Sequence, residues 1–273
     1  MTRQITEVLL IDGVRLFTRT LPLEPWFDLA GIRSPFVCAI TWNRRGYCGI
    51  WELVSDRLYL VGLSGTFSTE VEDIHFSEGS VATLFPDFPE RVFAHWYTGT
   101  IAADFDQLAA KGGIGEAPIG PRVVVVDIER GRVVRRTDRI DAPAAARPAA
   151  PAPEPEAEIA EILHPSRGVR REHLRERLTR AAIEAHESVL DPLGAAPTAP
   201  FGLLNAAWAS VVAHERPGDE WWSFERVGRM PPHNDSYDTG RRTGRMRGYA
   251  VVRGGRTVAA FICEITEPVP RVY

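Results

Sequence analysis

The sequence predicts two domains: an N-terminal all-β antiparallel barrel or sandwich over residues 1–140, and a small α+β domain over residues 166–273. Three observations support this fold class. The first half contains strand-like segments joined by tight-turn residues, residues 141–165 are dominated by Ala and Pro, and helical periodicity begins after them. The chain has 273 residues, 44% of them hydrophobic and 25% charged, which is typical of a globular protein.

The N-terminal domain is predicted to consist of hairpins. Asp12-Gly13 separates one pair of strands, and this dipeptide suits a type I′ turn because both of its residues need a positive φ. No long segment of this domain has a convincing helical period, so we expect a mainly antiparallel sheet. The expected strands are Glu7–Ile11 with Val14–Thr18, Tyr47–Val54 with Arg57–Leu63, Pro121–Ile128 with Arg132–Arg136, and Ala94–Ile101.

Residues 141–165 are predicted to be a linker. Between Asp141 and Ala157 the chain is almost entirely Ala and Pro, which cannot build a core and which favours an extended, semi-rigid conformation. The segments on either side are each long enough to bury a core of their own. The linker therefore marks the expected domain boundary.

The C-terminal domain is predicted to pack two helices against an antiparallel sheet. Apolar residues recur at helical spacing over Arg170–Leu190, and a second, more apolar helix is expected over Leu203–His214. A strand over Glu220–Phe224 and a hairpin around Gly254-Gly255 complete the expected module. The arms of that hairpin are Arg247–Arg253 and Arg256–Glu264.

Motifs in both domains resemble uncharacterised bacterial domain families. In the first domain these are the Arg45-Gly46-Tyr47 tripeptide, Leu84-Phe85-Pro86 and the run Phe93-Ala-His-Trp-Tyr-Thr-Gly-Thr100. In the second they are Pro217-Gly-Asp-Glu-Trp-Trp-Ser-Phe224 and Gly248-Tyr-Ala-Val-Val-Arg253, with an insertion around residues 231–235. These resemblances imply two modules in one polypeptide and bring no activity or catalytic residues with them.

Composition sets further expectations. No apolar run approaches the length of a membrane helix, and the first residues lack the apolar core of a secretory signal, so we expect a cytoplasmic protein. Lys111 is the only lysine among 32 basic residues. A GC-rich genome accounts for this arginine bias, although the arginine fork also suits phosphate.

The sequence lacks the common catalytic and cofactor motifs. Neither a nucleophile elbow nor a glycine-rich phosphate loop is present. Cys38, Cys48 and Cys263 are too scattered for a structural zinc site, and we expect them to act as small hydrophobic residues. Asp219 and Glu220 are adjacent in the chain, so a turn role for Asp219 is favoured over paired catalysis. We expect no cofactor and no bound metal.

His95 is the main catalytic candidate. It lies in an aromatic segment beside Trp96, and an imidazole titrates near neutral pH. One hypothesis is an enzyme whose site combines His95, Asp87 and Arg45. The alternative interpretation is a histidine that is hydrogen-bonded within the sheet.

Two groups of arginine and aromatic residues are candidate binding surfaces. Such residues dominate protein interfaces and also grip nucleic-acid backbones. The leading hypothesis is therefore a non-enzymatic accessory protein, of an immunity or defence type, whose two modules engage a protein partner; nucleic-acid binding through residues 241–247 is a further alternative. The candidate residues are Arg45, His95 and Trp96 in the first domain, and Trp221, Trp222, Arg241, Arg242, Arg245 and Arg247 in the second.

Overall fold

The computed structural model describes residues 5–37, 43, 45–68, 76–104, 122–140, 164–229 and 243–266. These residues form two compact units. Unit 1 holds the described residues up to Leu23 and those from Ser34 to Ile140, and unit 2 holds Glu24–Arg33 and those from His164 onward. The predicted linker lies mostly outside the described residues.

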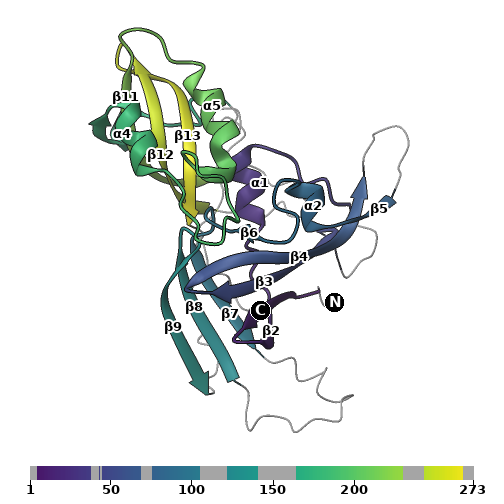
Figure 1. Cartoon of the computed structure of the whole chain (residues 1–273). Helices are drawn as coiled ribbons and strands as arrows, with labels where there is room; N and C mark the ends of the chain where they lie inside the picture. The colour runs from purple at the N-terminus through teal and green to yellow at the C-terminus, as the bar shows by residue number, and fades with distance from the viewer. Residues whose placement is uncertain are drawn as a thin grey trace, which may run out of the picture. The chain divides into compact units, whose positions relative to one another are not determined.

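Unit 1 is built on a sheet that closes into a barrel of seven strands, in the order β3-β1-β2-β7-β8-β9-β4, with β4 also pairing β3 (Figure 1). Strands β5 and β6 pair with β4 outside this ring. Neighbours are antiparallel except β1 and β3, which are parallel. The strands are β1 Glu7–Ile11, β2 Val14–Thr18, β3 Tyr47–Val54, β4 Arg57–Ser68, β5 Phe76–Gly79, β6 Val92–Phe93, β7 Gly99–Asp104, β8 Arg122–Glu129 and β9 Arg132–Ile140.

The three predicted hairpins of this unit are confirmed. Their turns contain residues with a positive φ, as two-residue hairpin turns require: Asp12-Gly13, Ser55-Asp56 and Arg130-Gly131. Alternate residues along the strands are buried, as a sheet with one covered face demands. Leu9 opposite Trp51, and Ile101 opposite Val126, are examples of fully buried pairs.

The strand predicted over Ala94–Ile101 is wrong in its first half. The chain turns at His95 and Trp96, where the Tyr97 amide donates a hydrogen bond to the Ala94 carbonyl (2.9 Å). The indole Nε1 of Trp96 donates to the carbonyl oxygen of Pro22 (2.8 Å), and its ring stacks on Phe85. Burial of this large ring outweighs the local preference of its neighbours for a strand.

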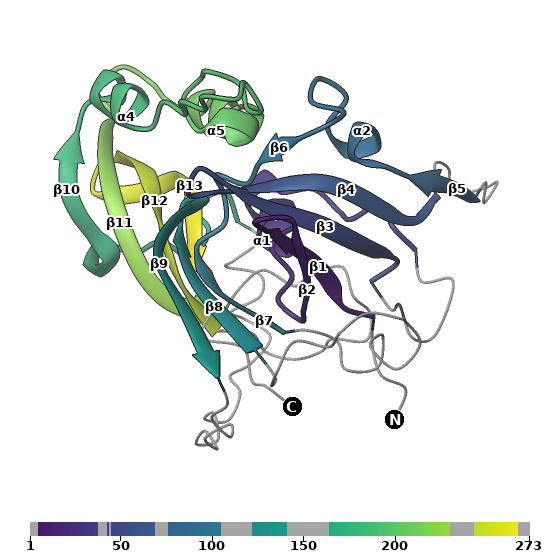
Figure 2. The same ribbon diagram turned by 60° about the horizontal axis from the view of Figure 1, so that its bottom comes forward.

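Unit 2 contains a four-stranded antiparallel sheet in the order β10-β11-β12-β13 (Figure 2). The predicted strand at Glu220 and the hairpin around Gly254-Gly255 are confirmed, and both strands of the hairpin extend further than expected. The elements are a 3-10 turn at Arg171–His173, β10 Leu174–Leu178, α4 Arg180–His186, a 3-10 turn at Gly202–Leu204, α5 Asn205–Val212, β11 Glu220–Arg229, β12 Thr243–Arg253 and β13 Arg256–Thr266.

The helix predicted over Arg170–Leu190 is wrong in its first part. Leu174 and Leu178 are the first two of the apolar positions on which that prediction rests, but they lie on strand β10 opposite Phe224 and Trp221 of β11. The helix α4 begins only after Thr179, whose side chain accepts a hydrogen bond from the Ala182 amide and caps it. Pairing with an existing sheet edge therefore overrides a weak helical period.

The N-terminal half also contains helices, which the all-β expectation missed. Helix α2 (Val81–Leu84) is a single turn in unit 1. Helix α1 (Glu24–Ala30) belongs to unit 2, where it packs against β13 and α5. Trp26, Phe27 and Leu29 of α1 are buried. Burial in unit 2 stabilises this short helix, which is too short to be stable by itself.

Replacing Gly248 by Ala tests the packing of β12 against β13. A β-carbon at Gly248 would collide with the backbone carbonyl oxygen of Phe261, beside an irregularity in the strand register. We expect Gly248→Ala to lower the free energy of unfolding of unit 2 by about 3 kcal/mol, because the backbone must move. Gly255→Ala, at the turn of the same hairpin, meets no atom within 4 Å but needs a positive φ; it should cost about 1 kcal/mol. Equal losses in urea unfolding would contradict this.

Candidate binding surface

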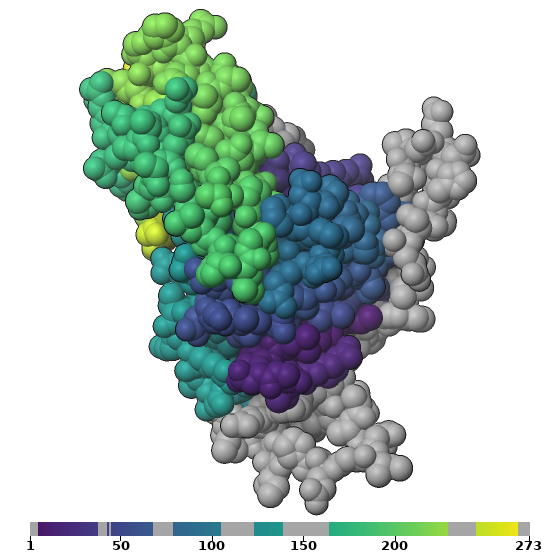
Figure 3. Space-filling model, in the orientation of Figure 1, coloured from purple at the N-terminus to yellow at the C-terminus, as the bar shows by residue number. Residues whose placement is uncertain are grey.

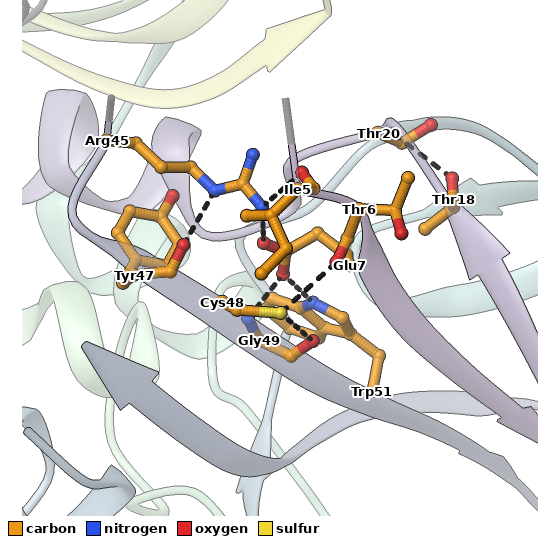
Figure 4. Close-up of polar contacts among 10 residues, drawn as sticks. All are labelled: Ile5, Thr6, Glu7, Thr18, Thr20, Arg45, Tyr47, Cys48, Gly49 and Trp51. Carbon is orange, nitrogen blue, oxygen red and sulfur yellow. Dashed lines mark hydrogen bonds and ion pairs between the residues drawn. The ribbon is translucent and has the colours of Figure 1, made fainter. Parts of the chain in front are cut away.

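Arg45 is held by a buried carboxylate rather than presented to solvent. The side chain of Glu7 is fully buried, and that of Arg45 is only 12% exposed. Arg45 Nη2 donates to Glu7 Oε1 (2.7 Å), while Glu7 Oε2 accepts from the Gly49 amide (2.9 Å) and from Trp51 Nε1 (2.8 Å) (Figure 4). Glu7 therefore accepts a charge-assisted bond and two further hydrogen bonds inside the barrel.

The remaining contacts of Arg45 are also with neighbouring parts of unit 1. Its Nε donates to the Tyr47 carbonyl (2.9 Å), its Nη2 donates to the Ile5 carbonyl (3.1 Å), and its guanidinium carbon lies 5.4 Å from the centre of the Tyr47 ring. These contacts occupy the side chain on several sides. Arg45 thus fixes the chain where it enters β3.

Cys48, on β3 beside this cluster, has the properties of a structural thiol. Its Sγ lies 3.2 Å from the Thr6 carbonyl oxygen. Burial, together with the nearby Glu7 carboxylate, raises the pKa of the thiol. A raised pKa keeps the thiol protonated at neutral pH, and the protonated form is a poor nucleophile.

His95 and Trp96 are both buried. Trp96 is 1% exposed, and His95 packs against the rings of Phe93 and Trp96. Burial, with a smaller effect of the Arg130 charge, lowers the pKa of His95 to about 3. The imidazole is therefore neutral at physiological pH and too weak a base to take up a proton readily there. Asp87, its suggested partner, is exposed.

In unit 2, a group of aromatic rings covers one face of the sheet. Trp208 of α5 packs against Trp221 (4.9 Å between centroids), Phe261 (5.5 Å) and Tyr249 (6.2 Å), and Phe201 completes the group. Aromatic clusters of this kind contribute both apolar burial and specific ring packing.

Three glutamates anchor the polar atoms of this cluster. Trp208 Nε1 donates to Glu184 Oε1 (3.1 Å), Trp221 Nε1 donates to Glu215 Oε1 (2.7 Å), and the Tyr249 hydroxyl donates to the buried Glu187 Oε1 (2.5 Å). Each bond satisfies a donor that would otherwise be desolvated. Together they fix α4 and α5 over β11 and β12.

The predicted aromatic residues of unit 2 have structural contacts. Trp221 is buried in the cluster just described, and the half-buried Trp222 donates through Nε1 to Glu220 Oε2 (3.0 Å).

Asp219 fulfils its expected turn role, because it accepts a hydrogen bond from the Arg216 amide (2.8 Å) and binds the Arg253 guanidinium through both oxygens. These bonds, chiefly the one from Arg253, lower the pKa of Asp219.

The two described residues of the predicted arginine group, Arg245 and Arg247, lie on β12. Arg245 and Arg247 are exposed, and the strand register places them opposite Val227 and Glu225 of β11. Directly opposite residues of an antiparallel pair point to the same face. We define Glu225, Val227, Arg245 and Arg247 as the β11–β12 patch.

Opposite charges are interleaved in the β11–β12 patch. Glu225 Oε1 lies 3.5 Å from Arg245 Nε, and Glu225 Oε2 lies 3.2 Å from Arg247 Nε. Glu264 of β13 is the register partner of Arg247 on the other side. Val227 is 70% exposed within this charged setting. The patch therefore offers an apolar contact surrounded by charges of both signs.

The sequence-based predictions include residues that the structure does not describe, and they leave out two buried glutamates. Arg241, Arg242 and Cys38 lie outside the described residues. Sequence reasoning missed Glu7 and Glu187, because an isolated glutamate in a strand or after a helix carries no sign of its burial. Alternation along β11, which places Val227 on the same face as Glu225, was the signal that could have revealed the patch.

Comparison with known proteins yields no relative. No family model, no curated protein and no solved structure matches the chain. Within the part of the chain that the structure describes, no helix is long and apolar enough to cross a membrane.

Glu7→Gln tests the buried pair. The neutral amide leaves the mostly buried guanidinium of Arg45 without its counter-charge, so we expect a loss of about 3 kcal/mol in the free energy of unfolding. The matched control is Arg91→Gln, which breaks an ion pair of the same length (2.7 Å to Glu52) in which both side chains are about one-third exposed. Breaking that pair should cost below about 1 kcal/mol. Comparable losses in urea unfolding would refute the assigned role of Glu7.

His95 predicts an acid-sensitive stability. Its folded pKa of about 3 lies below the ordinary value of 6.5, so only the unfolded chain takes up this proton between these values. The contribution of His95 to the free energy of unfolding is fully present above pH 6.5 and is lost as the pH drops toward 3. The loss amounts to about 2 kcal/mol at pH 5. Unfolding at pH 7.5 and 5 should show this loss in the wild-type protein, and it should be reduced by about that amount in His95→Gln. An identical pH dependence in both proteins would contradict the assignment.

Proposed function

We propose that this protein binds another protein and that the β11–β12 patch is a contact surface. The observation that carries this proposal is an open sheet face on which a largely exposed valine lies between arginine and glutamate side chains. Arginine is favoured at protein interfaces, and an apolar centre with a polar rim is their usual organisation. The aromatic cluster covers the neighbouring part of the same face, where the contacts of Trp221 and Tyr249 with Trp208 hold β11 and β12 in place beside the patch.

Charge favours a protein over nucleic acid as the partner. Binding to a phosphate backbone draws its strength from cations that replace condensed counterions. Glu225 already partly neutralises Arg245 and Arg247, and its own charge would repel phosphate. Base stacking also requires accessible rings, whereas Trp221 is buried.

The properties of unit 1 support a binding role over catalysis. The suggested general base, His95, is buried and has a strongly lowered pKa. Arg45 is engaged by Glu7, Ile5 and Tyr47. The three residues of the enzyme hypothesis therefore divide into one buried base, one structural cation and the exposed Asp87.

We further propose that the two units act as modules, with unit 2 as a small α+β domain. The Ala/Pro-rich residues 141–165 would form one connection between them as a spacer, in addition to the two points at residues 23–24 and 33–34 where the chain passes from one unit to the other. Such a connection raises the effective concentration of the second surface once the first has bound. This organisation suits a cytoplasmic accessory protein of the immunity or defence type, which acts by occupying a surface of its partner.

Site-specific photo-crosslinking tests the proposal. A benzophenone amino acid at position 227, introduced in the native host, should yield a discrete cross-linked protein because the side chain lies within the contact. The same probe at position 256, on the exposed end of β13, should not yield this product. Cross-links that disappear on nuclease treatment, or equal patterns from both positions, would overturn the proposal.

Charge reversal provides the matched control. Arg245→Glu/Arg247→Glu should lower the yield of the position-227 cross-link at least about tenfold, since both cations face the partner. Arg177→Glu/Arg256→Glu makes the same change in net charge at two exposed positions outside the patch. This second variant should retain the wild-type yield.

A further inference from the structure

One edge of strand β9 is open over most of its length. On one side, β9 pairs with β8 from Arg132 to Ile140. On the other side it meets β4 at one register position, Arg57 opposite Arg132, and the Val133 amide donates to the Asp56 carbonyl (2.9 Å). Within the described part of the chain, no strand pairs with this side of β9 beyond Val133.

Both faces of β9 are open beside that edge. All residues from Val134 to Asp138 are exposed, with Val134 at 60% and the Arg135 side chain at 73%. In Figure 3 the teal atoms of the β8–β9 region lie at the surface of the molecule. An added strand would therefore find backbone groups to pair with and room for its side chains on either side.

The charge of β9 indicates what kind of strand would fit. The strand has four arginines in nine residues and one acidic residue, Asp138. Arg135 binds Asp127 (2.6 Å) on β8, and Arg136 binds Asp12 (3.0 Å) in the β1–β2 turn. Arg136 also lies 3.6 Å from Asp138 of β9 itself. Both arginine side chains keep much of their surface exposed in these pairs, 73% for Arg135 and 41% for Arg136, so they can still contact acidic side chains of an added strand.

The same arginines disfavour pairing between two copies of this protein. Two β9 edges centred on residues 135 and 136 would place arginine opposite arginine, and like charges at directly opposite positions are destabilising. Exposed charge is a common protection of sheet edges against self-association. An acidic strand meets no such barrier, which gives the edge its selectivity.

We propose that the open edge of β9 binds an extended acidic segment of a partner protein as an additional strand. Main-chain hydrogen bonds along Val134–Asp138 supply the attraction, and Arg135 and Arg136 select acidic side chains. The proposal concerns unit 1 alone. It is independent of the β11–β12 patch, so either surface can fail its test without affecting the other.

Blocked peptides test the proposal on the whole protein. The probe is an acetylated and amidated octapeptide of alternating Glu and Val. We expect it to bind, and to slow amide hydrogen exchange in β9 but not in β10. A peptide of alternating Lys and Val should bind at least about tenfold more weakly because it meets the arginines with like charge.

N-methylation separates strand pairing from simple charge attraction. Methyl groups on the amides of alternate residues remove the donors on one edge of the peptide and leave its charges intact. One of the two alternating patterns methylates the amides that face β9, and it should weaken binding at least about tenfold because those hydrogen bonds are lost. The other pattern methylates the amides that face away from β9 and should have little effect. Equal affinity for both patterns and the unmethylated peptide would overturn the proposal, as would the absence of binding.

A pair of charge reversals localises the binding on the protein. Arg135→Glu/Arg136→Glu should lower the affinity for the acidic peptide at least about tenfold and raise the affinity for the Lys-Val peptide. The control is Arg175→Glu/Arg177→Glu on β10, which is also a charged edge strand. The assignment to β9 would be refuted if the peptide slowed amide hydrogen exchange in β10 and not in β9. It would also be refuted if both double variants lost the same affinity for the acidic peptide.

Discussion

The buried carboxylate of Glu7 is the constraint on which the barrel depends. It lies at the start of β1 and accepts hydrogen bonds from Gly49 and Trp51 of β3, the strand parallel to β1. This parallel pair attaches β3 to the rest of the sheet, and β3 closes the ring of strands by pairing with β4 on its other side. A carboxylate is costly to bury unless it is paired and hydrogen-bonded. Arg45 and the two β3 donors meet that requirement, and they do so only when β1 and β3 are in register.

The ring of strands is closed firmly where β3 pairs with β1 and with β4, but only weakly where β4 meets β9. Strands β4 and β9 meet beside the Arg130-Gly131 turn and then separate, so a barrel with a filled interior still has an open strand edge. Unit 2 has a related feature, since β11 and β12 continue beyond the part of their face that α5 and Trp208 cover. On β9 the accessible backbone lies beyond the last pairing with β4, and on β11 and β12 the accessible side chains lie beyond the part of the face that α5 covers. Both proposed surfaces lie at these uncovered parts of the two sheets.

The candidate site was predictable only in part. Arg245 and Arg247 were found from their density in the sequence, and strand alternation places them on one face. Arg45, His95 and Trp96 were selected by the same reasoning, yet the fold places them in contacts within unit 1. Arginine and aromatic residues serve surfaces and cores alike. Whether such a residue faces solvent depends on segments distant in the chain, as Pro22 is from Trp96.

The sequence by itself determined the hairpins, because a positive-φ turn and two alternating strands involve residues that are close along the chain. It also determined α5 and the β12–β13 hairpin. Tertiary structure alone decided the parallel pairing of β1 with β3, the strand at Leu174–Leu178 and the membership of α1 in unit 2. Each of these rests on burial against a partner remote in sequence, and the free energy of that burial exceeds the local preferences of a few residues. Local interactions thus set the elements, and non-local burial decided which faces and edges remain accessible.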